Sequence, residues 1–159
     1  VSRAAVESGV SPWRLWSIMW VESRYQPDVR SSAGALGLMQ VLLPTAREMA
    51  DRLQAGFRVT RRALYHPETN VRVAAELLAS LEHWGRCSVV VSVAYNAGPS
   101  RARSWLPPDK PMDADVWLER VPYLGAEAYA RRVASLEALY ADLYGDGTGS
   151  SPACRVPAR

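Results

Sequence analysis

Lysine and cysteine are nearly absent from this chain of 159 residues. Lys110 is the only lysine, so arginine supplies almost all of the positive charge, and the formal net charge is only +3. The basic residues form no dense run and no nucleic-acid-binding motif, so we expect no nucleic-acid partner. The weak positive balance mildly favours an anionic polymer or surface.

The two cysteines, Cys87 and Cys154, are too few to predict a disulfide framework. No metal-ligand spacing surrounds either of them, so the sequence predicts no metal site, and nothing in it calls for a cofactor. Two unrelated thiols are the simpler interpretation, because Cys154 lies close to the end of the chain. A bond between the two cysteines remains the open alternative.

Long apolar runs are also missing. No segment approaches the length of about 18 residues that a membrane-spanning helix needs, so we expect no membrane span. The chain begins at Val1 with neither a methionine nor a basic-then-apolar leader, and we interpret it as a piece of a longer protein. An export signal could belong to the missing part, so its absence here says nothing about the compartment.

The residues that are present have an ordinary globular composition, with 48% hydrophobic and 22% charged. Glycine, proline and serine interrupt the chain at intervals that predict helices joined by short loops. We expect one all-α domain of about seven to nine helices over residues 1–144. Residues 145–159 are rich in Gly, Ser and Pro, and we expect them to be a disordered tail or linker.

Capping residues predict the individual helices. Ser11 suits the N-cap position and Pro12 the first turn of the helix that follows. Ser88 is expected to cap a helix over residues 89–96, although its valine-rich start would also fit a strand by propensity. That segment lacks the alternation of a half-buried strand, so we interpret it as a buried helix. The other expected helices are residues 1–8, ended by Gly9, then 12–23, 44–53, a long one from Pro67 that ends at Gly85, and 126–144. Gly98-Pro99 is expected to stop the helix over residues 89–96. Apolar residues mark one face of each of the two longest helices, namely Val71, Ala74, Leu78 and Leu81 in the first, and Tyr129, Val133, Leu136, Tyr140 and Leu143 in the second.

One carboxylate stands in an unusual position. Within the expected helix 12–23, Leu15, Ile18, Met19 and Glu22 share one face, at spacings i, i+3, i+4 and i+7. Burial and the negative end of the helix dipole would both raise the pKa of the Glu22 carboxyl. A carboxylic acid kept neutral near pH 7 is what a general acid requires. The alternative is a solvated glutamate at a frayed helix end, the commoner case for carboxylates.

Other conspicuous residues have structural interpretations of their own. Met39 can fill core, and Tyr129 heads an apolar stripe, which makes a core aromatic the default. Trp13, Trp16 and Trp20 share the other face of the Glu22 helix, and we interpret them as core residues rather than as a sugar platform. The stretches that draw attention are residues 21–23, 33–40, 94–99 and 119–129.

Taken together, these stretches resemble the catalytic domain of the Slt-type soluble lytic transglycosylases, which belong to the lysozyme-like superfamily. The resemblance covers residues 4–143 and implies a lysozyme-like helical fold. It also implies peptidoglycan glycan strands as the partner and the periplasm or cell envelope as the location. The matching pieces, in chain order, are Glu22-Ser23, Gly37-Leu38-Met39-Gln40, residues 66–72, Ala94-Tyr95-Asn96-Ala97-Gly98, and Val121-Pro122-Tyr123 with Tyr129.

The resemblance implies a specific reaction. Such enzymes cleave the β-1,4 bond between N-acetylmuramic acid and N-acetylglucosamine without water, to give a 1,6-anhydro product. Glu22 would first protonate the leaving oxygen and then accept a proton from the muramoyl 6-hydroxyl that attacks C1. The matching motifs hold no second carboxylate, which agrees with a nucleophile that comes from the substrate. Ser23 would orient the substrate or the loop of Glu22.

The resemblance also implies substrate contacts away from the acid. Met39 and Gln40 would line the cleft, with Gln40 hydrogen-bonding a sugar. Tyr95 and Asn96 would contact sugars or brace Glu22. Tyr129 resembles the family tyrosine whose hydroxyl lies near the catalytic glutamate, where a phenol could hold the carboxyl in its productive rotamer.

The chain departs from the family pattern at one point. Aligned on Pro122 and Tyr129, the positions of a usual Glu-Thr pair hold Gly125 and Ala126, and Glu127 comes two residues late. On a helix Glu127 would face another direction. We therefore expect weakened activity or an altered glycan preference, and a gain when Glu and Thr are installed.

Two other functions remain open. A hydrolytic muramidase on the same fold would need a positioned water and a second carboxylate. A glycan-binding module whose catalysis has lapsed is slightly favoured by Gly125 and Ala126, but the intact Glu22-Ser23 pair opposes it.

Overall fold

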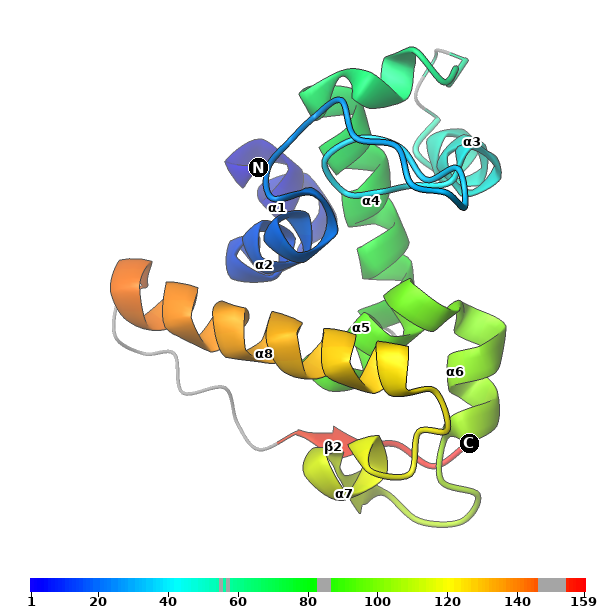
Figure 1. The fold of residues 1–159 in the computed structure, drawn as a ribbon, viewed down its shortest axis with the longest axis vertical. Helices are drawn as coiled ribbons and strands as arrows, with labels where there is room; N and C mark the ends of the chain where they lie inside the picture. The colour runs from blue at the N-terminus through cyan, green and yellow to red at the C-terminus, as the bar shows by residue number, and fades with distance from the viewer. Residues whose placement is uncertain (55, 57, 83–86, 146–153) are drawn as a thin grey trace. The chain divides into compact units, whose positions relative to one another are not determined.

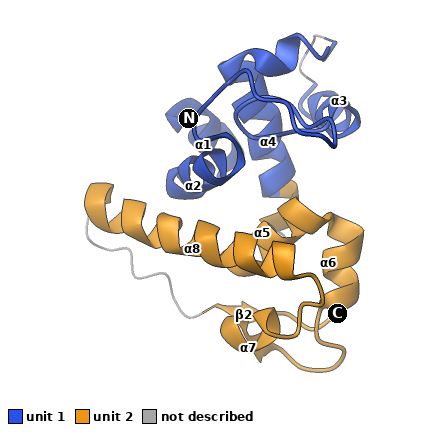
Figure 2. Ribbon diagram, in the orientation of Figure 1, with its two compact units in different colours: residues 1–79 blue, residues 80–159 orange. Residues whose placement is uncertain are grey.

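The computed structural model describes residues 1–54, 56, 58–82, 87–145 and 154–159. This described part contains eight α-helices, one short 3₁₀ helix and a two-stranded sheet (Figure 1). The predominance of helix confirms the all-α fold class. The chain divides into two compact units, residues 1–79 and residues 80–159 (Figure 2).

Unit 1 begins with two capped helices, as the sequence predicts. Gly9 ends α1 in the left-handed conformation, with φ of 73°. The Ser11 hydroxyl accepts the Arg14 N–H at 3.5 Å, and Pro12 occupies the first turn of α2. Both devices satisfy or tolerate backbone groups that a helix end leaves unpaired. The helices are α1 (Ser2–Ser8), α2 (Pro12–Ser23), α3 (Leu43–Arg52), η1 (Ala63–Tyr65) and α4 (Pro67–Glu82), which extends past residue 79.

The expected apolar face of α4 is confirmed. Val71, Ala74, Leu78 and Leu81 are each at most 5% exposed. Their spacing of three or four residues places them along one side of the helix. Gly85, the expected end of this helix, lies outside the described residues.

Unit 2 is built on the contact between α5 (Ser88–Ala97) and α8 (Leu124–Tyr144). The valine-rich segment forms a helix, and Val90, Val91 and Val93 are at most 1% exposed, so burial on several sides outweighs strand propensity. Ser88 does not cap α5 as predicted. Cys87 is the N-cap residue, and the Ser88 hydroxyl donates instead to the Glu137 carboxylate on α8.

Two short helices in unit 2 were not predicted. Pro99 starts α6 (Pro99–Trp105) directly after the Gly98 turn, where the sequence indicated only a stop. The second is α7 (Ala114–Leu118), in which Trp117 is 1% exposed and donates its indole N–H to Trp105 O at 2.8 Å. Helices this short owe their stability to tertiary packing rather than to a pattern that the sequence displays.

The C-terminal residues correct a second expectation. Cys154 forms a disulfide with Cys87, so the two cysteines are not unrelated thiols. Next to it, β2 (Arg155–Val156) pairs antiparallel with β1 (Met112–Asp113), and Val156 is fully buried. The expected disordered tail over residues 145–159 is therefore not what the structure has at residues 154–156. Residues 146–153 lie outside the described part.

Candidate active site

Glu22 lies in the last turn of α2 and is half-buried. The predicted shared face is confirmed for its apolar members, since Leu15, Ile18 and Met19 are 0%, 0% and 3% exposed. Their burial fixes the rotation of α2, and therefore the direction in which its last turn presents the carboxylate.

Ser23 ties the end of α2 to a distant loop. Its hydroxyl lies 3.1 Å from Met19 O and 2.8 Å from Leu38 O, so its single proton can be donated to either carbonyl. The side chain is only 5% exposed. This placement supports the role of orienting the segment of Glu22, one of the two roles expected for Ser23.

Two consecutive left-handed residues end α2. Arg24 and Tyr25 have φ of 54° and 63°, a conformation that L side chains seldom adopt. Their side chains are held by ring contacts, because the Arg24 guanidinium lies 4.6 Å from the centre of the Trp20 ring and Tyr25 packs on both Trp16 and Trp20. Such backbone strain persists only where the surroundings impose it.

These contacts correct the core interpretation of the tryptophans. Trp16 is 37% exposed, and Trp13 and Trp20 are only partly buried. The face opposite Leu15 and Ile18 therefore carries a surface aromatic cluster, formed by Trp16, Trp20 and Tyr25. Helical periodicity showed that these tryptophans share a side but could not show what covers that side.

The loop with Gly37-Leu38-Met39-Gln40 is held by Asn70 of α4. The Asn70 amide donates to Leu36 O at 2.8 Å and to Leu64 O at 2.9 Å, and its oxygen accepts Met39 N–H at 2.7 Å. Gly37 has φ of 76°, and a Cβ there would lie 2.3 Å from Leu64 O, so only glycine fits. The loop is thus fixed relative to α4 by buried hydrogen bonds.

Met39 and Gln40 occupy different environments within this loop. Met39 is fully buried, which matches the core-filling alternative. Gln40 has φ of 49°, and its side-chain amide donates to Gly37 O at 2.9 Å and to Val29 O at 3.2 Å. Buried in this way, Met39 offers no surface to a substrate, so the structure does not support its expected place in the cleft lining. Contact of Gln40 with a sugar stays a prediction, to be made through its amide oxygen.

The remaining candidate binding residues belong to unit 2. Tyr95 is partly buried and Asn96 is exposed in the last turn of α5, and Gly98 then ends the helix with φ of 93°. Tyr129 is 8% exposed in the first half of α8, the helix against which α5 packs. Their contacts with sugars, and with Glu22, stay predictions.

The departure at residues 125 and 126 falls in the first turn of α8. Gly125 is exposed, and a Cβ added there would meet the ring of Tyr123 at 3.2 Å, which is the movable end of a side chain. Ala126 is fully buried. Glu127 forms an ion pair with Arg131 at 2.9 Å, so its carboxylate already has a partner on α8.

Sequence reasoning missed Asn70 as a support of this site, and it missed the aromatic cluster on the neighbouring surface of α2. Asn70 was included only in the connecting segment of the resemblance, although a polar amide directly before the buried residue Val71 was a usable signal. For the cluster, the left-handed conformation of Tyr25 leaves no mark in the sequence, because tyrosine rarely adopts it.

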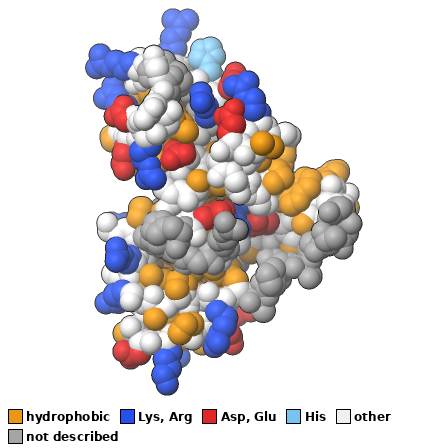
Figure 3. All heavy atoms as spheres, turned by 180° about the vertical axis from the view of Figure 1, so that it is seen from behind, with side chains coloured by type: hydrophobic (Ala, Val, Ile, Leu, Met, Phe, Trp, Pro, Cys, Tyr) orange, Lys and Arg blue, Asp and Glu red, His pale blue; other side chains and the backbone are white. Residues whose placement is uncertain are grey.

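Charge and metal chemistry add little to this site. Within the described ranges, no group of three or more His, Cys, Asp and Glu side chains is placed to hold a metal ion. The helices of the described residues are all too short or too polar to cross a bilayer. Several Lys and Arg side chains lie at the top of the face drawn in Figure 3, with Asp and Glu side chains close to them. The exposed arginines of unit 1 include Arg58, Arg61 and Arg62.

What the arrangement offers chemically is one carboxyl group on a firmly held segment. Glu22 is followed by a buried hydroxyl bonded to the Leu38 carbonyl, and then by a strained turn under aromatic contacts. A general acid is most effective when the surrounding residues hold its carboxyl group in a single orientation. A helix that ends in such a carboxylate beside a glycine-containing loop makes Glu22 the candidate general acid of this helical domain.

The chain belongs to the family described as the Transglycosylase SLT domain, which it matches over residues 1–117. It is 32% identical over 127 residues to the soluble lytic murein transglycosylase of Escherichia coli K12, which covers 79% of this chain and 20% of that protein. It is also 34% identical over 100 residues to the peptidoglycan transglycosylase gp16 of Escherichia phage T7, covering 62% and 7%.

Solved structures show the same fold. An inactive mutant of the lytic transglycosylase Slt from Pseudomonas aeruginosa superposes with a TM-score of 0.84 at 31% identity, covering 91% of this chain and 24% of that one. The 70-kDa soluble lytic transglycosylase of Escherichia coli gives 0.83 at 28% identity, with the same coverage. The chain spans about a fifth of the length of the first curated relatives that it matches.

Proposed function

We propose that this chain is the catalytic part of a lytic transglycosylase that acts on peptidoglycan glycan strands. Membership of the SLT family and the names of its relatives support the class of reaction. The observation that carries the assignment to a residue is the position of Glu22, half-buried at the end of α2, where Ser23 and the Arg24–Tyr25 turn hold the backbone.

The proposed reaction needs one carboxyl group and no water. Glu22 donates its proton to the glycosidic oxygen as the bond from that oxygen to C1 of N-acetylmuramic acid breaks. The resulting carboxylate then takes the proton of the muramoyl 6-hydroxyl while the 6-oxygen bonds to C1. The products are a free 4-hydroxyl on N-acetylglucosamine and a 1,6-anhydromuramoyl end, and Glu22 regains its proton.

The other assigned residues bind or position. Ser23 holds the Glu22 segment, and Gln40 contacts the glycan from the loop that Asn70 fixes. The fully buried Met39 supports that loop from the core instead of lining the cleft. Tyr95, Asn96 and Tyr129 contact the sugars from unit 2, with Tyr129 restricting the rotamer of the acid. The fraction of relatives that the chain spans supports a place within a longer protein.

We place this protein in the periplasm or cell envelope. Both cysteines are joined in the Cys87–Cys154 disulfide, a bond that persists in oxidising compartments and is rare in the reducing cytosol. Thiol alkylation followed by mass spectrometry tests this for the protein purified from its native cells. Unmodified, bonded cysteines are expected, and alkylated cysteines would contradict this placement.

The first measurement is mass spectrometry of the soluble products released from purified peptidoglycan. Wild-type protein should release anhydro ends, and Glu22→Gln should be slower by about 10²–10⁴-fold, the typical contribution of a general acid or base. Glu48→Gln is the matched control, because Glu48 is an exposed carboxylate of α3 with no assigned role. Reducing ends, heavier by one water, would overturn the proposal in favour of hydrolysis.

A further inference from the structure

Unit 1 contains a pocket of about 580 Å³ between α1, α2 and the first turns of α4, with Val1, Tyr25 and Leu38 completing its lining. Sites for small molecules commonly enclose about 300–1,000 Å³. Glu22 and the six candidate binding residues are absent from its described lining. The pocket is therefore a separate feature from the candidate active site, although both involve α2.

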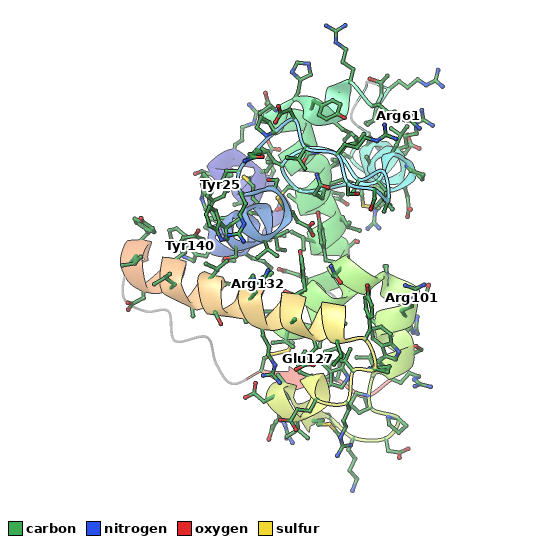
Figure 4. The ribbon with its side chains drawn as sticks, viewed as in Figure 1. Tyr25, Arg61, Arg101, Glu127, Arg132 and Tyr140 are labelled. Carbon is green, nitrogen blue, oxygen red and sulfur yellow. A yellow bond between two sulfur atoms is a disulfide. The ribbon has the colours of Figure 1, made fainter. Side chains whose placement is uncertain are left out.

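One wall of the pocket is aromatic. Trp16 is 37% exposed, and the Tyr25 ring meets it edge to face, with ring centres 5.5 Å apart and planes at 85°. The Tyr25 hydroxyl donates to Trp16 O at 3.4 Å, which holds the ring beside α2 (Figure 4). Met19 and Leu38 supply apolar surface below this wall.

A second wall, formed by residues of α1 and α4, is ionic and internally paired. Arg3 lies 2.8 Å from Glu68 and 3.3 Å from Glu7, and Arg72 lies 3.6 Å from Glu7. These two arginines and two glutamates are the charged side chains in the described lining, so their charges cancel. Arg72 Nε itself is buried and faces the Glu7 carboxylate at 3.6 Å, so the polar groups open to a ligand are those of the more exposed Arg3, Glu7 and Glu68.

From these two walls we infer that the pocket is an accessory saccharide site that takes an N-acetylated amino sugar. The apolar C–H face of a pyranose ring packs on Trp16 and Tyr25. Its hydroxyl and acetamido groups exchange hydrogen bonds with the arginines and glutamates. That this sugar belongs to a peptidoglycan strand rests on the proposed function.

Two other occupants fit the walls less well. Peptidoglycan stem peptides carry free carboxylates, and a wall whose charges cancel offers no net attraction to an anion. An apolar segment of protein would strip water from four charged side chains, which is costly without new polar partners. A neutral ligand with many hydroxyl groups avoids both penalties.

The pocket shares structure with the Glu22 segment. Met19 and Leu38 are both part of its lining, and their carbonyl oxygens are the two partners of the Ser23 hydroxyl. A glycan strand held here would add a second attachment within unit 1 and raise the local concentration of its remaining sugars.

The test is an NMR titration of ¹⁵N-labelled Glu22→Gln protein with tri-N-acetylchitotriose, because this variant prevents turnover. The indole N–H signal of Trp16, assigned with Trp16→Phe, should shift saturably. The signal of Trp117 is the internal reference, since that indole is buried and bonded to Trp105 O. A Trp16 signal that does not move, whether the sugar binds elsewhere or not at all, would overturn the inference.

Variants on both walls separate binding from folding. Trp16→Ala should weaken binding about tenfold, the loss of one good aromatic contact. Arg3→Ala, a change to an exposed residue of the ionic wall, should weaken sugar binding severalfold. If Trp16→Ala lowers the melting temperature, the Arg3→Ala variant decides the test instead. Val6→Ala should bind as wild type, because Val6 is 84% exposed on α1 and does not line the pocket.

Two further comparisons make the outcomes distinguishable. Binding that persists at high salt supports a neutral sugar, whereas salt-sensitive binding confined to peptide-bearing muropeptides would replace it with a peptide site. Trisaccharide binding at Trp16 without anhydro products from wild type would refute the proposed function alone. Anhydro products without any response at Trp16 would refute the pocket alone.

Discussion

Unit 1 and unit 2 achieve their stability by different means. All four non-glycine residues with positive φ in the described part, Arg24, Tyr25, Gln40 and Gln54, belong to unit 1. Its irregular loop is held by the buried amide of Asn70 and the hydroxyl of Ser23. Unit 2 relies on the contact of α5 with α8 and on a disulfide.

The difference corresponds to what each unit contributes. A strained backbone needs many specific hydrogen bonds to hold one conformation, and such strain commonly gathers at functional sites. Unit 1 carries Glu22 together with this strain. Unit 2 carries its candidate binding residues on α5 and α8, two regular helices that pack against each other.

The largest expected effect comes from removing the disulfide of unit 2. Cys87→Ser with Cys154→Ser should lower the free energy of unfolding by about 4 kcal/mol, because the bond closes a loop across 67 positions. Hydrogen exchange should show the loss of protection in α5, α8 and β1 before α2.

Reduced wild-type protein is the control for that double variant. It should match the variant, whereas reduction of the variant itself should change nothing. Equal loss of protection in α2 and α8 would mean that the bond stabilises the whole chain and that the contrast between the units is wrong.

Asn70→Ala should remove the hydrogen bonds that hold the loop of unit 1. It removes the partners of three backbone groups, and each buried group left unsatisfied costs about 1–3 kcal/mol, so a loss of about 3 kcal/mol or more is expected. Chemical denaturation measures this loss, and product release should fall with it because the loop beside Ser23 loosens.

Asn70→Asp keeps the size and the acceptor for Met39 N–H but replaces the donor to Leu36 O and Leu64 O. We expect it to be destabilised as strongly as Asn70→Ala, since an ionised carboxylate would face two carbonyl oxygens. Wild-type stability of the aspartate variant would show that the two donated hydrogen bonds contribute nothing.

The smallest effect is expected in the first turn of α8. Gly125→Glu should raise stability by about 0.5–1 kcal/mol, because it replaces an exposed helical glycine and puts an acid near the helix N-terminus. Activity on peptidoglycan should also rise if the family glutamate contributes to it. Thermal unfolding and product release measure the two effects separately.

The structure limits the double replacement that the sequence suggested. Ala126 is fully buried, so Thr at this position would add volume and a hydroxyl to packed core and should cost stability. Ala128→Glu is the control for added charge, since Ala128 is an exposed position of the same helix. An equal gain in activity from Ala128→Glu would attribute the effect to charge alone.

Much of the fold followed from local rules in the sequence. Ser11 and Pro12 predicted the start of α2, because capping depends on residues within a few positions of each other. The stripe of Val71, Ala74, Leu78 and Leu81 predicted the buried face of α4. The apolar stripe of α8 was right for Val133, which is fully buried, but Leu143 is 59% exposed.

Long-range partners were out of reach of the same rules. The disulfide between Cys154 and Cys87 depends on the fold that brings the two residues together. The strand β2 likewise depends on its pairing with β1, where Val156 lies opposite Met112. The sequence predicted Ser88 as a helix cap, whereas in the structure its hydroxyl donates to Glu137 of α8. Each of these contacts joins positions more than 40 residues apart.

By itself the sequence determined the helical class, the family and the place of Glu22 at the end of α2, since periodicity and short motifs are local properties. The tertiary structure decided which groups hold that carboxylate segment, namely Ser23, Asn70 and the ring contacts of Tyr25. It also decided that Trp16 faces a pocket rather than the core. Burial depends on what the rest of the chain brings to a surface, and no local pattern contains that information.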